Sequence, residues 1–398
     1  MTSLNVKELL DSWTLREKTY KRDIEDEILK FISNKNAVFL YGPRRSGKSI
    51  IARRLLDRMP KNTKTRYVNL EDPQLITHLN IGILDEFAKG IGPDDIIVFD
   101  EIQLINGWEK WVRKAVDTRQ CKVIVTGSSA KLLSSEFATS LGGRGIGFQI
   151  LPFSFHEFRR ISGKGFEEYI KTGGYPEVVL NPGKKEKLLE SYFELTLIKD
   201  ITSRYNVRDS AALRNLAFYL LTNSGKETSL KKLRGTLKLS YDTIRQFIEY
   251  LEASFLVFQV PFFSYSLKES FTRSRKIYAF DLGMQQYASK SFSDDKCGLA
   301  ETSVAIDLKN RKYDIFYWRG KKEVDFIAKK KTEIIPINVC YNNFIPEREF
   351  QGIFEFCHSN KIKDAKILYT GGKIKKTENN VVISLENIEK WLLRKHDE

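Results

Sequence analysis

The segment from Val38 to Ser49, VFLYGPRRSGKS, constrains the fold of this chain more than any other. Its first four residues are apolar, which is typical of a buried strand in a parallel sheet. The residues from Gly42 to Ser49 then match the phosphate-loop (Walker A) pattern G-x-x-x-x-G-K-[ST] at every fixed position. Residues 50–59 have amphipathic helical spacing, so the segment predicts a strand, a phosphate-binding loop and a helix.

The fixed positions of this loop suit a nucleoside triphosphate. Gly42 and Gly47 allow backbone angles that turn successive N–H groups toward phosphate. Lys48 would face the β and γ phosphates, and the Ser49 hydroxyl is a natural Mg²⁺ ligand. The following helix would direct its positive end at the anion. We therefore expect ATP and Mg²⁺ here, with the nucleotide bound by Gly42, Pro43, Arg44, Arg45, Ser46, Gly47, Lys48 and Ser49.

Four further segments predict strands, and helical segments separate most of them. They are Arg66–Leu70, Ile96–Phe99, Lys122–Thr126 and Gly147–Ile150. Strands that alternate with helices indicate an α/β fold with a parallel, doubly wound sheet. Before the first strand, Tyr20–Phe31 has the spacing of an amphipathic helix.

The strand at Ile96–Phe99 ends in two carboxylates, Asp100 and Glu101, as in a Walker B motif. We expect Asp100 to hold Mg²⁺, directly or through water, and Glu101 to orient and polarise the attacking water. The alternative is a surface acidic pair that ends a strand. The phosphate loop upstream favours the catalytic interpretation, because the two sets of roles are consistent.

Two further candidates follow. Ser128, after the next strand, could contact the γ-phosphate or the water if that strand lies between the two motif strands. We favour this role, and the alternative is an ordinary strand-to-helix turn, for which Gly-Ser-Ser is also suitable. Arg144, in the loop Leu141–Gly145, is a candidate arginine finger acting in cis or in trans, and an ordinary loop arginine is the alternative.

Composition limits the other possibilities. The 398 residues suggest two to four domains, and 41% hydrophobic with 29% charged residues exclude a disordered tail. The net charge of +15 favours nucleic acid or an acidic partner, although a generally lysine-rich surface has the same composition. The scattered cysteines form no C-x-x-C pair, and no apolar run could span a membrane or act as a signal peptide. We expect a cytoplasmic protein without disulfides, zinc or membrane contact.

The order of motifs along the chain is more specific than any one of them. It is GPRRSGKS, YVNLEDP (Tyr67–Pro73), VFDEIQ, VTGSSAKLL, LGGRG, LPFSFHEF (Leu151–Phe158) and GGYPEVV (Gly173–Val179). This order resembles the AAA-family P-loop ATPases of archaea and bacteria that carry a C-terminal winged helix and a restriction-endonuclease-like domain. The resemblance implies nucleotide and magnesium chemistry at Lys48, Ser49, Asp100 and Glu101, a sensor role for Ser128 and a finger role for Arg144.

The resemblance also implies a domain order. Residues 1–151 would be the ATPase core with its helical lead-in, 152–205 an all-α lid, 206–290 a winged helix and 291–398 an α/β restriction-endonuclease-like domain. In the winged helix, Ser229 and Ser240 are candidate N-caps and Tyr241–Glu252 is the candidate recognition helix, with strands at Ser254–Val260 and Lys276–Phe280. Basic residues on these helices and the wing could hold DNA phosphates: Lys231, Lys232, Arg234, Lys238, Arg245, Lys268, Arg273 and Arg275.

The nuclease-like part departs from the pattern of an active enzyme. Glu301 and Asp325 fit two of its metal-binding positions, but Asn338 stands where an acid belongs and Cys340 where a lysine belongs. An amide is a weaker Mg²⁺ ligand, and a neutral thiol carries no positive charge. We therefore predict that this site does not cleave DNA. A nuclease with a displaced lysine is the alternative.

These observations predict an Mg²⁺-dependent ATPase that couples its nucleotide state to a C-terminal DNA-binding module. The alternative is a nucleotide-dependent switch whose C-terminal half binds a protein partner, since a winged helix also serves in protein contacts. An arginine finger would in addition suggest a homo-oligomer.

Overall fold

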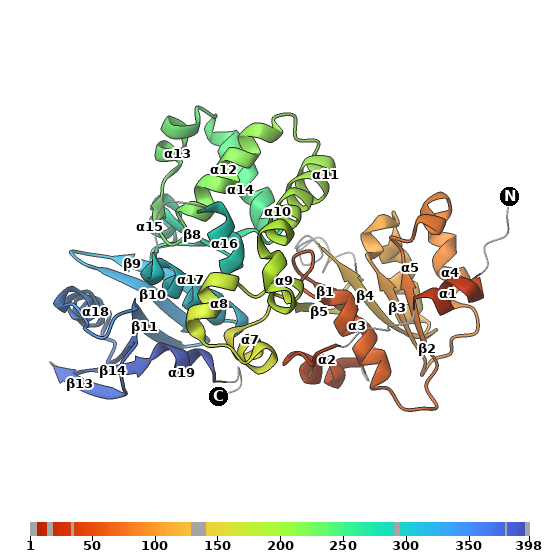
Figure 1. The fold of residues 1–398 in the computed structure, drawn as a ribbon, viewed down its shortest axis with the longest axis horizontal. Helices are drawn as coiled ribbons and strands as arrows, with labels where there is room; N and C mark the ends of the chain where they lie inside the picture. Colours follow the sequence, from red (N-terminus) through yellow and green to blue (C-terminus); the bar gives the residue numbers. More distant parts are fainter. Residues whose placement is uncertain are drawn as a thin grey trace. The chain divides into compact units, whose positions relative to one another are not determined.

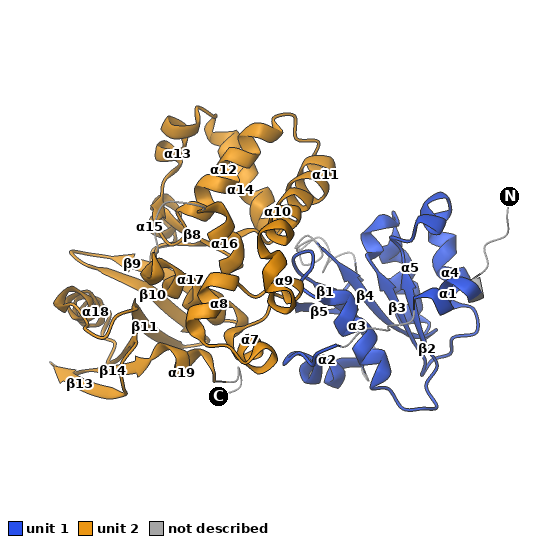
Figure 2. Cartoon of the chain, viewed as in Figure 1, with its two compact units in different colours: residues 1–150 blue, residues 151–398 orange. Residues whose placement is uncertain are grey.

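A computed structural model describes residues 6–13, 19–32, 36–128, 141–289, 295–378 and 380–394 of the chain (Figure 1). These residues fall into two compact units, Met1–Ile150 and Leu151–Glu398, each with its own sheet and core (Figure 2). None of the helices in the described ranges has both the length and the apolar character that a membrane crossing requires.

The first unit is built on a five-stranded parallel sheet with the strand order β2-β3-β4-β1-β5. Every residue of β1 and β3 is buried, which explains why both strands are continuous apolar runs. The predicted α/β core is thereby confirmed. Its strands are β1 (Ala37–Tyr41), β2 (Thr65–Asn69), β3 (Ile96–Asp100), β4 (Lys122–Gly127) and β5 (Gly145–Gln149).

The helices of this unit follow the predicted alternation, with one correction at the start of the chain. The helix expected over Tyr20–Phe31 begins only at Glu25, whose carboxylate accepts a hydrogen bond from the Arg22 backbone N–H at 2.8 Å and so satisfies a donor just before the helix. The helices are α1 (Val6–Ser12), α2 (Glu25–Ile32), α3 (Lys48–Asp57), α4 (Ile81–Ala88) and α5 (Trp108–Asp117), with short 3₁₀ turns at Pro73–His78 and Ile102–Leu104.

The second unit begins with helices over residues 155–205. They are α7 (Phe155–Ser162), α8 (Phe166–Thr172), α9 (Pro176–Leu180), α10 (Lys185–Leu195) and α11 (Ser203–Tyr205), with a π-helical turn at Thr196–Thr202. The Gly174 N–H donates to the Asp281 carboxylate at 2.7 Å, and Lys296 pairs with Glu167 at 3.0 Å. The helical segment thus packs on later parts of the same unit, and the finer domain boundaries remain a prediction.

A three-stranded antiparallel sheet follows, in the order β6-β8-β7, beside the helices α12 to α14. Ser229 accepts from Lys232 N at 3.2 Å and Ser240 from Thr243 N at 3.1 Å, so both predicted N-caps are confirmed. The elements are α12 (Ser210–Thr222), β6 (Glu227–Thr228), α13 (Leu230–Leu237), α14 (Tyr241–Ala253), β7 (Val257–Val260), α15 (Leu267–Thr272), β8 (Arg275–Ala279) and α16 (Leu282–Ala288).

The C-terminal part forms a six-stranded mixed sheet with the order β13-β14-β12-β11-β10-β9. Strands β9 and β10 form an antiparallel pair, and β11 pairs with β10 on one side and β12 on the other. The elements are α17 (Lys296–Asn310), β9 (Asp314–Arg319), β10 (Glu323–Lys330), β11 (Glu333–Cys340), α18 (Glu347–Asn360), β12 (Asp364–Tyr369), β13 (Ile374–Glu378), β14 (Val381–Asn387) and α19 (Ile388–Leu392).

Candidate nucleotide-binding site

The predicted site residues meet at the carboxyl edge of the parallel sheet in the first unit. β1 leads into the loop that starts at Gly42, β3 ends at Asp100, and β4 runs into Ser128. β4 lies between β1 and β3, which is the condition under which Ser128 was expected to lie near a bound phosphate. The carboxyl edge of an open parallel sheet is where such folds bind their ligands.

The loop between β1 and α3 depends on its two fixed glycines. Gly42 has φ +151°, and a Cβ on it would lie 2.1 Å from the Ile150 carbonyl oxygen. Gly47 has φ 96° and precedes α3 without any side-chain cap on the helix N-terminus. The first N–H groups of α3 therefore keep their capacity to bind an anion.

Lys48 lies inside the loop and is only 4% exposed. Its Nζ donates to the carbonyl oxygens of Gly42 at 3.1 Å and Pro43 at 2.8 Å. Ser46 Oγ is also buried, and it has no hydrogen-bond partner among the described residues. A buried ammonium on neutral acceptors and a buried, unpaired hydroxyl fit a site for phosphate oxygens.

Asp100 connects the loop to the neighbouring strands. Its carboxylate accepts hydrogen bonds from the side chains of Tyr67 and Thr126, and the Ser49 side chain lies near enough to favour its charged form. Burial, and then the charge of Glu101, raise the pKa of Asp100 above its ordinary value, while these hydrogen bonds act in the opposite direction. The contact between Ser49 and Asp100 brings together the two oxygen ligands expected for Mg²⁺.

Glu101 is 7% exposed and adopts a left-handed backbone conformation, with φ 56°. Strain of this kind in a residue with a side chain is frequent at functional sites. The Glu101 N–H donates to Thr126 Oγ1 at 3.1 Å, and its carboxylate accepts from the Gln103 side chain. Thr126 thus contacts the carboxylate of Asp100 and the backbone of Glu101.

Arg144 does not join the other candidates within this unit. It precedes β5, whose first residue pairs with Ala37, the first residue of β1, and so it lies at the amino edge of the sheet. The loop lies beyond the last residue of β1, a strand length of about 16 Å away at 3.3 Å per residue. The Arg144 guanidinium pairs with Asp117 at the end of α5 and donates to the Gly142 carbonyl at 3.1 Å.

Three side chains near the loop were not singled out from the sequence. The Arg22 guanidinium donates to the Ser46 carbonyl at 3.0 Å, and Tyr67 and Thr126 hold Asp100. Thr126 had a signal, because it is a polar residue that follows the apolar run Val123–Val125 near the end of β4. Arg22 and Tyr67 had none, since their partners are distant in sequence.

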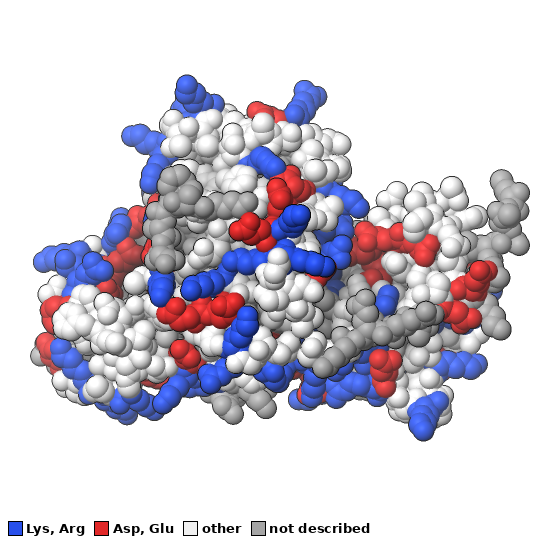
Figure 3. All heavy atoms as spheres, viewed as in Figure 1, with Lys and Arg blue, Asp and Glu red and all other residues white. Residues whose placement is uncertain are grey.

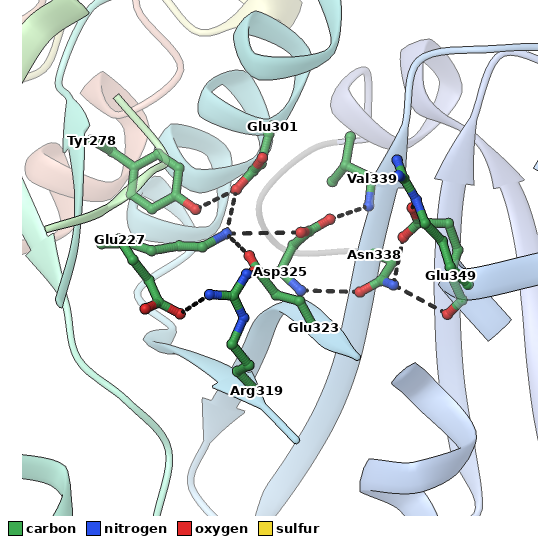
Figure 4. Close-up of polar contacts among 11 residues, drawn as sticks. Glu227, Tyr278, Glu301, Arg319, Glu323, Asp325, Asn338, Val339 and Glu349 are labelled. Atoms are coloured by element: carbon green, nitrogen blue, oxygen red, sulfur yellow. Dashed lines mark hydrogen bonds and ion pairs between the residues drawn. The ribbon is translucent and has the colours of Figure 1, made fainter. Parts of the chain in front are cut away.

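The nuclease-like residues meet in the second unit, around a lysine from outside the predicted pattern. Glu301, Glu323 and Asp325 point toward a common position (Figure 4). Lys276 Nζ occupies it, 2.8 Å from Glu301, 2.5 Å from Glu323 and 3.8 Å from Asp325. Sequence reasoning placed Lys276 in a wing strand and did not connect it with these carboxylates.

The two substituted positions have structural partners. Asn338 is buried; its Oδ1 accepts from the Asp325 N–H at 3.0 Å and its Nδ2 donates to the Glu349 carboxylate at 2.8 Å (Figure 4). Burial raises the pKa of the Cys340 thiol to about 11, which keeps it neutral. Within the described ranges, no group of His, Cys, Asp and Glu side chains is arranged to hold a metal ion.

The helices of the proposed winged helix differ in charge. Lys231, Lys232, Arg234 and Lys238 on and beside α13 are all exposed. The exposed face of α14, the candidate recognition helix, carries Asp242 and Glu249 beside Arg245. On the face drawn in Figure 3, basic side chains are interspersed with acidic ones.

Comparison with protein families matches three segments of the chain. An AAA domain covers residues 34–159, and two domains of unknown function follow, DUF8612 at 163–295 and DUF4143 at 296–388. The Walker-type ATPase PABY2304 of Pyrococcus abyssi is a solved structure that covers 69% of this chain and 97% of its own, at 15% identity and a TM-score of 0.46.

Two relatives match most of the chain. The uncharacterized protein MJ1544 of Methanocaldococcus jannaschii is 32% identical over 385 residues, which cover 88% of this chain and 83% of the relative. An uncharacterized protein of Haemophilus influenzae is 28% identical over 394 residues, covering 92% of this chain and 97% of the relative. The matched AAA domain and the parallel sheet identify the first unit as a P-loop AAA-type domain. The match to MJ1544 shows that the chain belongs to one family with that protein.

Proposed function

We propose that the protein binds ATP with Mg²⁺ at the loop Gly42–Ser49, hydrolyses it, and couples its nucleotide state to DNA binding by the second unit. The observation that carries the proposal is the meeting of Lys48, the Ser49–Asp100 contact and Glu101 at one edge of the parallel sheet. The uncapped N-terminus of α3 and the unpaired Ser46 hydroxyl support a triphosphate as the ligand.

In this mechanism the loop N–H groups and Lys48 neutralise the phosphate oxygens. Mg²⁺, held by Ser49 and Asp100, would supply further positive charge. Glu101 accepts a proton from a water molecule as the water oxygen bonds to the γ-phosphorus. The bond from the γ-phosphorus to the bridging oxygen breaks, and ADP and phosphate leave. Thr126 holds Glu101 in place, and Ser128 contacts the γ-phosphate as a sensor.

Substitution of Glu101 tests the hydrolytic part. Glu101→Gln keeps the size of the side chain but cannot accept the proton, so we expect normal ATP affinity and turnover reduced by about 100-fold or more. Glu109→Gln, in the first turn of α5, is the matched control and should hydrolyse ATP at the wild-type rate. A normal rate in Glu101→Gln would show that another group is the base.

Arg144 has a place in this proposal only as a group that acts on a neighbouring copy. Its position at the amino edge of the sheet separates it from its own loop. A finger role in trans would make turnover per subunit rise with protein concentration in the wild type but not in Arg144→Ala. A concentration-independent rate that Arg144→Ala leaves unchanged would remove this role.

The DNA part of the proposal is supported by the exposed basic side chains of α13. The test is a titration of duplex binding against salt. Each phosphate contact adds about 0.9 to the slope of log K against log salt, so Lys231→Ala with Lys232→Ala should lower the slope by about 1.8. Absence of duplex binding at low salt would favour a protein partner. The acidic residues on α14 would repel DNA phosphates but could contact a protein surface.

The proposal includes a nuclease-like domain that does not cut DNA. The amide of Asn338 and the neutral thiol of Cys340 support this. Plasmid incubated with the protein in Mg²⁺ or Mn²⁺ should stay supercoiled. Nicking that disappears in Asp325→Ala would instead establish a nuclease with a displaced lysine.

A further inference from the structure

Lys276 lies where a cation would be expected, among carboxylates from different parts of the second unit. The lysine comes from β8, Glu301 from α17, and Glu323 and Asp325 from β10. The side chain of Lys276 is 3% exposed, and its Nζ lies 2.8 Å from Glu301 Oε1 and 2.5 Å from Glu323 Oε1. These distances are those of direct charge-assisted hydrogen bonds.

Other hydrogen bonds orient the carboxylates toward the lysine. Tyr278 OH donates to Glu301 at 2.6 Å, and the Val339 N–H donates to Asp325 Oδ2 at 2.8 Å (Figure 4). Arg319, which is about half exposed, pairs with Glu323 at 2.7 Å and with Glu227 at 2.8 Å. Lys276 is therefore the buried cation of the cluster, and Arg319 balances Glu323 from the solvent side.

The pKa values of Lys276 and of the surrounding carboxylates depend on one another. Burial alone would lower the pKa of Lys276, but Glu301 and the other carboxylates raise it well above its usual value. Burial and the charge of Glu301 raise the pKa of Asp325, whereas Lys276 lowers it. Several carboxylates this close cannot all stay ionised without a cation among them.

We propose that the ammonium of Lys276 is a built-in substitute for a divalent metal ion, and that it keeps the Glu301–Glu323–Asp325 cluster metal-free. The ammonium fills the position on which the carboxylates converge, so a metal would have to displace a buried, paired charge. Its burial also argues against a catalytic lysine, which would need to reach a water molecule or a phosphate.

The substitution has a structural consequence. An ammonium is covalently part of β8, so the cluster ties the three-stranded sheet to the strand β10 of the six-stranded sheet. A metal would hold Glu301, Glu323 and Asp325 together but leave β8 out. The ion pairs of Lys276 therefore link the three-stranded sheet to the six-stranded sheet.

The inference predicts that removal of the ammonium opens a metal site. In Lys276→Met the side chain is one heavy atom shorter and uncharged, so the Nζ position is vacated and the three carboxylates lose their cation. Mn²⁺ or Mg²⁺ could then bind there. Asp325 must approach by more than 1 Å, because it lies 3.8 Å from Nζ and Mg²⁺–oxygen distances are about 2.0–2.1 Å.

The experiment measures Mn²⁺ binding by nucleotide-free, full-length protein, by electron paramagnetic resonance and by the melting temperature. Lys276→Met should bind one additional Mn²⁺ and melt several degrees higher with Mn²⁺ than without. The wild type and Lys329→Met, the same substitution at an exposed position of β10, should show neither effect. Lys276→Met combined with Glu301→Gln should lose the added binding.

Each outcome of this experiment either supports or overturns the inference. Mn²⁺ binding to the wild type that Glu301→Gln removes would overturn the inference, as would a Lys276→Met protein that gains none. If Lys276→Met does not fold alone, refolding that succeeds only with Mn²⁺ supports the inference, and failure with and without Mn²⁺ overturns it. The inference rests on the proposed inactivity of the nuclease-like domain and refines it, but plasmid nicking and Mn²⁺ binding are separate readouts, so either statement can fail alone.

Discussion

Two lysines in this protein are almost equally buried and have opposite surroundings. In the first unit, Lys48 Nζ donates to the carbonyl oxygens of Gly42 and Pro43. In the second, Lys276 Nζ lies against the carboxylates of Glu301, Glu323 and Asp325. Carbonyl oxygens are neutral acceptors that a phosphate oxygen can replace. A carboxylate bound to a buried ammonium cannot leave without exposing two unpaired charges.

The difference shows that burial alone does not give a lysine its role. An ammonium that donates to neutral carbonyl oxygens keeps its affinity for an incoming anion. An ammonium that is paired with carboxylates is already neutralised. We therefore expect Lys48 to matter for ligand binding and Lys276 for stability.

The largest expected effect is on the stability of the second unit. Without metal, Lys276→Met should lower the free energy of unfolding by about 3–5 kcal/mol, because it leaves buried carboxylates without their cation. Lys48→Met should cost less, because the carbonyl oxygens of Gly42 and Pro43 that accept from Nζ are uncharged. Denaturant unfolding of both variants measures the difference, and equal losses would remove the contrast.

The pH dependence offers a second measure of the same contact. The folded pKa of Lys276 is raised above 10.5, so its contribution to stability is complete below pH 10.5 and is lost as the pH rises through the folded value. The wild type should thus lose more stability than Lys276→Met when the pH is raised above 10.5. Parallel curves for the two proteins would contradict the raised pKa.

The next effect concerns ligand affinity. Lys48→Ala should weaken ATP binding by about 100-fold, equivalent to about 2.8 kcal/mol, because it removes the charge that faces the phosphates. Lys276→Met, if it is folded, should bind ATP like the wild type. Calorimetric titration with ATP and Mg²⁺ measures both, and a wild type that gives no binding heat would refute the nucleotide site altogether.

The acceptors of Lys48 depend on the backbone of Gly42. Gly42→Ala places a Cβ 2.1 Å from the Ile150 carbonyl, so we expect a loss of about 2 kcal/mol in stability together with weaker ATP binding. Gly92→Ala is the control, because its Cβ would meet only Asp95 at an ordinary 3.5 Å. If the two variants behave alike, the loop does not have the geometry described.

The smallest effect is expected at Thr126, which contacts the Asp100 carboxylate and the Glu101 backbone N–H. Its role resembles that of Tyr278 and Val339, which donate to carboxylates of the second unit. Thr126→Val removes the hydroxyl that contacts Asp100 and Glu101 and should lower turnover by about 10-fold at nearly unchanged ATP affinity. Thr126→Ser keeps the hydroxyl and should restore the rate. A valine variant with full activity would exclude this positioning role.

Much of the first unit could be predicted because its information is local. A run of apolar residues, two glycines and a lysine specify a strand, a loop and a helix within the span Val38–Ser49, and the structure has each of them. The N-caps Ser229 and Ser240 were predictable for the same reason, since a cap bonds to a residue three positions away.

Other features depended on chain segments that meet only on folding. The carboxyl ends of β1, β3 and β4 converge because of the strand order, which also leaves Arg144 at the far edge of the sheet. The sequence alone did not relate Lys276 to any carboxylate, because Glu301 on α17 and Glu323 on β10 meet β8 only in the folded protein.

The sequence by itself determined the phosphate loop, the acidic strand end and the α/β core. Each of these features is formed by residues that are neighbours in the sequence and that set the local backbone geometry. Only the tertiary structure decided which charges became counter-ions, because the energy of a buried charge depends on groups brought to it from elsewhere in the chain. Lys48 and Lys276 are chemically the same side chain, and their surroundings alone assign them different tasks.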